Sequence, residues 1–191
     1  MKGSDKKINY EIIERKKIIF QFFLVSIFSF VGGILFVNLV SDEFLSLIAL
    51  NVQLGYNANI GSDFFDLVLR NSLDDIAIII TLYVFSFSFI NYLVSDLALS
   101  FLGFKTGLCV HTYFLSDISY FKLFALLSIK MALLTVVLLF ACALGVKTLR
   151  LIKYRINTRV RLDRKCFASI TILTVSTAGA IIVLNAVGLL I

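Results

Sequence analysis

Cys109 and His111 are residue types that could do chemistry together, because a histidine can take the proton of a cysteine thiol and activate it for nucleophilic attack. They lie in the stretch GFKTGLCVHTYFL, residues 103–115, which holds the only histidine of the chain. On a helix, however, residues two positions apart point about 200° away from each other. The spacing therefore argues against a cysteine–histidine catalytic pair.

Metal and carboxylate chemistry are also difficult to build from this sequence. A single histidine excludes a zinc site of the H-E-x-x-H kind within the chain. The membrane spans that we expect contain no aspartate or glutamate, which argues against an aspartyl pair or a carboxylate proton relay. Cys109, Cys142 and Cys166 form no C-x-x-C pair and are interpreted as small apolar packing residues. We predict that the protein is not an enzyme and needs no cofactor or metal.

The composition is that of a membrane protein. Of the 191 residues 60% are hydrophobic, and proline and tryptophan are absent. Runs of about 20 apolar residues can cross the hydrocarbon core as helices, and only helices or closed barrels do so. We predict an all-α, polytopic membrane protein of one domain. Five transmembrane helices are expected at about 18–41, 76–95, 97–116, 123–146 and 166–191.

The distribution of charge predicts the orientation of these spans. Residues 1–17 contain six lysines and arginines, and residues 147–165 contain eight, whereas residues 42–75 contain six acids and one arginine. Basic loops stay in the cytoplasm, so we expect a cytoplasmic N-terminus, an external 42–75 loop and an extracytoplasmic C-terminus. This orientation requires three spans between residues 75 and 147, which makes 97–116 a full span or part of a re-entrant pair.

The basic segment 147–165 also explains the formal net charge of +6 without a nucleic-acid partner. Apolar residues are interspersed among its charges, which predicts an interfacial helix that continues the fourth span and contacts anionic membrane lipid. A surface for a protein or nucleotide partner is the alternative.

The external segment GSDFFDLVLRNSLDD, residues 61–75, has apolar residues at helical spacing. It is expected to form an amphipathic helix that leads into the second span. The helix would expose Asp66, Arg70, Asn71 and Asp74 on the extracytoplasmic side. These residues either set the entry angle of the span or dock an external partner.

Small and polar residues share one face of the 97–116 span, beginning at the residue before it. On a helical wheel they fall within about 80° of one another. They are Asp96, Ser100, Gly103, Gly107 and His111. Such a stripe allows a neighbouring helix to approach closely, from the same chain or from a partner.

Lys105 and Lys130 are the two cations expected deep in the membrane. Lys105 lies about 14 Å along the helix from Asp96, too deep to reach water easily. With no acid expected in any span, both lysines lack an intrachain counter-charge. Either helix tilt brings them to water, or a partner subunit, a second copy or a lipid supplies the anion.

The order of these features resembles the stage II sporulation protein M family of multi-pass membrane proteins. The resemblance covers nearly the whole chain and rests on the short stretches FVGGILFVNLV, DFFDLVLRNSLDD, FKTG and ALGVKTLRLIKYR. Two positions depart from the family pattern. His111 stands where a second glycine is common, and Lys130 stands near the start of the fourth span, where a proline is often found.

The resemblance implies a membrane scaffold of a septal peptidoglycan-degrading complex in sporulation, active during engulfment. Its partners would be two membrane-anchored cell-wall hydrolases, stage II sporulation proteins D and P. The alternative is a permease-like membrane subunit of an ABC-type exporter, for which the basic segment 147–165 would contact the nucleotide-binding subunit.

Overall fold

The computed structural model describes residues 2–40, 64–88, 90–115, 120–158 and 164–190. For residues 2–12, 64–67, 70, 71, 111–115, 149–158, 164 and 165 it describes only the backbone. Within the described residues the chain forms five α-helices and no strand, which confirms the all-α prediction. The helices are α1 (Lys2–Val37), α3 (Phe64–Phe85), α4 (Asn91–Leu115), α5 (Tyr120–Thr158) and α6 (Arg164–Leu190).

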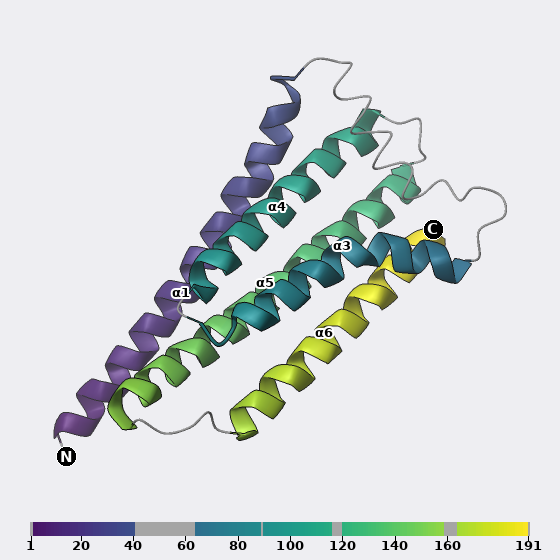
Figure 1. The fold of residues 1–191 in the computed structure, drawn as a ribbon. Coiled ribbons are helices and arrows are strands. Elements are labelled where there is room, and N and C mark those ends of the chain that lie inside the picture. The colour runs from purple at the N-terminus through teal and green to yellow at the C-terminus, as the bar shows by residue number, and fades with distance from the viewer. Residues whose placement is uncertain (1, 41–63, 89, 116–119, 159–163, 191) are drawn as a thin grey trace.

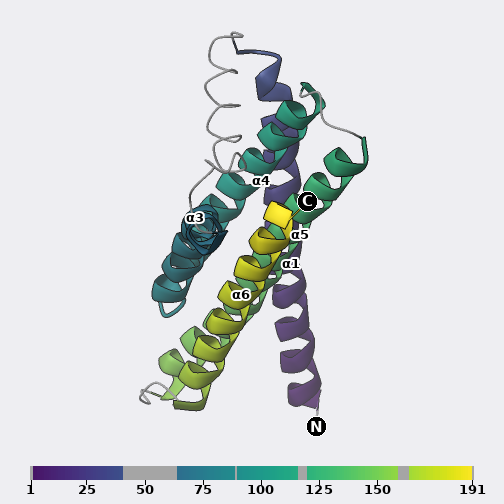
Figure 2. The same cartoon turned by 90° about the vertical axis from the view of Figure 1, so that its right-hand side faces the viewer.

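The helices form a bundle around α5. Helices α1 and α4 lie side by side on one flank, and α3 and α6 lie on the other (Figures 1 and 2). Apolar side chains from all five helices meet in one core, which includes Phe22, Leu82, Leu99, Phe140 and Ile170. The two flanks are therefore joined mainly through α5.

Four of the helices are long and apolar enough to cross a membrane. They contain the candidate spans Ile13–Val37, Asn91–Val110, Tyr120–Thr148 and Cys166–Leu190. Their outward faces carry large apolar side chains such as Phe28, Phe101 and Leu139, as expected for surfaces that contact lipid. Helix α3 is not among these four, and its first half contains the charged residues Arg70, Asp74 and Asp75. A fifth span is therefore a proposal.

The predicted boundary between the second and third spans is wrong. We expected the second span to end at Ser95, but α3 ends at Phe85 and α4 begins at Asn91. Asp96 consequently lies inside α4 and not between two spans. The error arose because the turn sequence SFSFI, residues 86–90, is itself apolar and aromatic and gives no contrast with the flanking helices.

The turn between α3 and α4 is held by a side chain from α5. The hydroxyl of Thr148 donates to the backbone oxygen of Ser86 at 2.7 Å, and the Asn91 amide donates to the Thr148 hydroxyl at 3.1 Å. All three residues are buried. A buried backbone oxygen at a helix end needs such a partner, so Thr148 fixes the turn against α5.

Replacing Thr148 by valine is expected to lower the free energy of unfolding by about 2 kcal/mol. Valine keeps the shape but leaves the Ser86 oxygen and the Asn91 amide without their partner. Circular dichroism during denaturation in mild detergent measures the change. Thr135→Val is the matched control, because the exposed Thr135 hydroxyl bonds only to the Met131 oxygen of its own helix. Equal stabilities of the two variants would contradict this role of Thr148.

The helical continuation predicted for the basic segment 147–165 is seen in α5, which runs unbroken through Thr158. Residues 159–163 lie outside the described part of the chain. At the start of the segment the Lys147 ammonium donates to the Ser169 hydroxyl of α6 at 2.7 Å. Because α5 ends at Thr158, it extends about 15 Å beyond Thr148, at 1.5 Å per residue.

Candidate functional site: a charged pair inside the helix bundle

Helices α1 and α4 approach each other closely at three glycines. A Cβ atom on Gly33 would overlap the backbone oxygen of Phe104, and one on Gly107 would overlap that of Phe30. A Cβ on Gly103 would lie 2.8 Å from the backbone oxygen of Ser26. The G-x-x-x-G spacing of α4 thus faces α1 of the same chain, with Gly33 as its counterpart.

The remaining residues of the small and polar stripe extend this contact. The Gln21 amide of α1 donates to the Asp96 carboxylate of α4 at 2.6 Å. Outside the stripe, Phe36 of α1 and Phe104 of α4 meet edge to face, with ring centroids 5.2 Å apart. His111 lies on α4, but its side chain is outside the described residues. The described part of the stripe therefore joins α4 to α1.

The Lys105 side chain points away from the contact between α1 and α4 and toward α3. Its ammonium nitrogen lies 3.9 Å from an Asp75 carboxylate oxygen and 3.7 Å from an Asp74 oxygen. The Asp75 side chain is only 8% exposed, whereas that of Asp74 is 79% exposed. A charge pair thus links α3 to α4, and its acid partner is almost fully buried.

The expectation that Lys105 lacks an intrachain counter-charge is therefore wrong. It depended on a second span that started at Ile76 and left Asp75 outside. In the structure, α3 is one continuous helix from Phe64 to Phe85, and its charged first half packs beside α4 and α6. The helix predicted for residues 61–75 and the following span are thus a single element.

Asn185 of α6 completes the site. Its amide nitrogen lies 3.3 Å from an Asp75 oxygen and 3.3 Å from the Ser72 hydroxyl, and donates to both. Ser72, Asp75 and Asn185 are buried. We call Ser72, Asp75, Lys105 and Asn185 the polar centre. Its hydrogen bonds and ion pair connect α3, α4 and α6 where a bare carboxylate would be strongly disfavoured.

A small cavity of about 20 Å³ adjoins the polar centre. It lies between α3, α4 and α5, and Asp75, Lys105 and Lys130 contribute to its lining. A volume of this size can hold about one water molecule when several polar groups surround it. Lys130 is therefore placed beside Asp75 and Lys105, in the same polar region of the bundle.

Sequence reasoning missed Asp75 and Asn185. Asp75 had a signal, because it lies three residues after Ser72 on the same helical face and directly before an apolar run. Asn185 was also visible as an amide within the apolar run 166–191. Polar residues inside a span are candidates for function or assembly, so the sequence contained a signal for both positions.

The polar centre combines an ion pair with two hydrogen bonds. Cys109, the neighbouring thiol, is buried and packs against Leu126. Among the described residues, no group of three histidine, cysteine, aspartate or glutamate side chains could hold a metal ion.

Of the four exposed residues predicted on the external helix, Asp74 is confirmed as exposed, while the side chains of Asp66, Arg70 and Asn71 lie outside the described residues.

Fold and site together define an all-α protein with four helices able to cross a membrane and with a charged pair inside the bundle. Comparisons of the chain with protein-family models, with curated proteins and with solved structures found no match. Function must therefore be inferred from the residues and their arrangement.

Proposed function

We propose that this protein is a non-enzymatic membrane scaffold that docks other membrane-anchored proteins. The observation that carries the proposal is the polar centre, in which Asp75 of α3 pairs with Lys105 of α4 and accepts a hydrogen bond from Asn185 of α6. Polar groups that bond across helices in this way hold the helices together. They do not form a nucleophile with an adjacent general base. They support a rigid frame whose role is to position partners.

The docking surface that we propose is the face of α3 that contains the exposed Asp74, and helical spacing assigns Asp66, Arg70 and Asn71 to the same side of the helix. Asp74 on this face is the chain neighbour of Asp75, which belongs to the polar centre. The polar centre therefore fixes α3 to α4 and α6 directly beside the docking surface. The charge distribution of the sequence supports an extracytoplasmic position for this end of α3, with a cytoplasmic N-terminus, an extracytoplasmic C-terminus and α3 as a fifth span.

The partners that we propose follow from the resemblance to the stage II sporulation protein M family. They are the membrane-anchored cell-wall hydrolases, stage II sporulation proteins D and P, within a peptidoglycan-degrading complex at the septum. An external docking surface suits these enzymes because their substrate lies outside the membrane. The membrane anchors of such partners would contact the apolar outer faces of the bundle.

A permease-like subunit of an ABC-type exporter is the second candidate, and the length of α5 favours it. About 15 Å of basic helix extends beyond Thr148, where a nucleotide-binding subunit could contact it. Lys153 and Arg155 lie on this extension.

Co-purification from the native membrane in mild detergent, with mass-spectrometric identification, tests the two candidates together. We expect the wild-type protein to recover cell-wall hydrolases. Exchanging the charges of the external pair, Asp66→Arg with Arg70→Asp, keeps an i,i+4 pair on α3 but inverts the surface, and should reduce hydrolase recovery several-fold.

Reversing the basic extension of α5, Lys153→Glu with Arg155→Glu, is the matched control and should leave hydrolase recovery unchanged. Recovery of an ATPase that this second variant loses would refute the scaffold and favour the exporter. Equal hydrolase recovery by the wild type and the external exchange would refute the docking surface on α3.

A further inference from the structure

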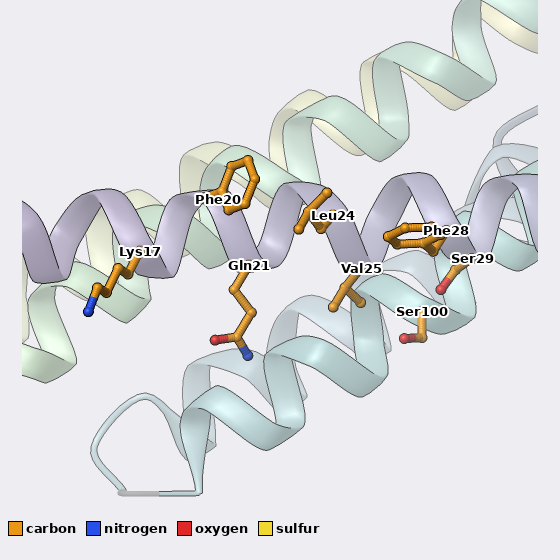
Figure 3. Close-up of a pocket in the computed structure, with 8 residues that line it drawn as sticks. All are labelled: Lys17, Phe20, Gln21, Leu24, Val25, Phe28, Ser29 and Ser100. Carbon is orange, nitrogen blue, oxygen red and sulfur yellow. The ribbon is translucent and has the colours of Figure 1, made fainter.

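An open groove runs along the surface where α1 meets α4, whereas the polar centre lies where α4 meets α3 and α6. It is a shallow groove, open to the surroundings, with a volume of about 490 Å³. It is lined by seven residues of α1 and by Ser100 of α4, whose side chains are drawn in Figure 3. The groove is distinct from the docking surface proposed on α3.

The groove is basic at one end and apolar along its length. Lys17 lies at the basic end, and the amide of Gln21 lies one turn further along α1 (Figure 3). Both side chains are exposed. Phe20, Leu24 and Phe28 then form an apolar wall. The nearby carboxylate of Asp96 on α4 accepts a hydrogen bond from the Gln21 amide at 2.6 Å.

The length of the groove distinguishes between the possible occupants. From Lys17 to Ser29 the helix rises about 18 Å, at 1.5 Å per residue. One leaflet of a bilayer has a hydrocarbon depth of about 15 Å, half of the core thickness. A transmembrane helix would require a groove across both leaflets. Ser29 and Ser100, whose side chains are small, form the deep end.

We propose that this groove binds one anionic glycerophospholipid from the leaflet at the basic end of α1. The phosphate lies at Lys17, with Lys16 in the same turn also exposed, and Gln21 is within reach of the polar glycerol region. One acyl chain follows Phe20, Leu24 and Phe28 toward Ser29 and Ser100. Basic sites between membrane helices recognise anionic headgroups through this combination of charge and apolar contact.

Native mass spectrometry of the purified protein with added phosphatidylglycerol or phosphatidylcholine tests the proposal. The wild type should retain one phosphatidylglycerol and retain phosphatidylcholine less well. Lys17→Gln should weaken phosphatidylglycerol retention about fivefold and leave phosphatidylcholine unchanged. Ser100→Phe, which fills the deep end, should reduce retention of both lipids, with circular dichroism confirming that the variant folds.

Lys122→Gln is the control, because Lys122 is an exposed lysine near the opposite end of the bundle, in the first turn of α5. It should bind phosphatidylglycerol as the wild type does. Equal retention of the two lipids by the wild type would overturn the proposal, and so would an unchanged Lys17→Gln variant. A second copy of the chain or another polypeptide retained in place of lipid would overturn it too. None of these results depends on hydrolase docking.

Discussion

Replacing Lys105 by leucine is expected to lower the free energy of unfolding in mild detergent by about 3 kcal/mol. The substitution removes the ammonium group that pairs with the buried Asp75 carboxylate, to which the Asn185 amide still donates a hydrogen bond. A buried charge that loses its partner is strongly destabilising, and the cost is at the low end of the usual range here because Lys105 is 37% exposed. Denaturation followed by circular dichroism measures the loss.

The double variant Asp75→Leu with Lys105→Leu is expected to regain most of this stability. Removing both charges also removes the cost of holding them away from water, so the effects of the two single substitutions should not add. Asn185 keeps Ser72 as a hydrogen-bond partner in the double variant.

Asp74→Leu is the control for the charge pair, because Asp74 also lies near Lys105 but is 79% exposed. An exposed ion pair contributes about 0–1 kcal/mol, so this variant should remain close to the wild type. If the double variant lost the sum of the two single effects, Asp75 and Lys105 would not be coupled.

The helices could be predicted from the sequence where apolar runs are bounded by charges. The spans expected at 18–41, 123–146 and 166–191 fall within α1, α5 and α6 except at their outermost residues. The turn at 86–90 could not be located, since its stabilising partner, Thr148, lies about sixty positions further along the chain. The local composition of residues 86–90 cannot indicate a hydrogen bond to a residue so far along the chain.

The candidate site was predictable in part for a related reason. Helical periodicity placed Gly103 and Gly107 on one face of α4, and it separated Lys105 from them. It could not reveal that Gly33 or Asp75 would lie opposite, because that depends on how far one helix is shifted along another. Faces can be deduced from one segment, whereas contacts between segments require the packed bundle.

Substituting leucine for Gly33 is expected to destabilise the protein by about 3 kcal/mol or more. Its Cβ would overlap the backbone oxygen of Phe104 and lie 3.1 Å from the Gly107 Cα. Backbone atoms cannot move aside as a flexible side chain can, so α1 and α4 would have to separate. Denaturation in mild detergent measures the change.

The adjacent residue provides the matched control, because a Cβ on Gly32 would meet nothing within 4 Å. Gly32→Leu gains the same helix propensity, about 0.8–1 kcal/mol, without the clash, and should be neutral or slightly stabilising. The difference between the two variants therefore isolates the close approach. Gly107→Leu should resemble Gly33→Leu, because each blocks the same contact from the opposite helix. If Gly32→Leu and Gly33→Leu were equally stable, tight packing of α1 on α4 would be contradicted.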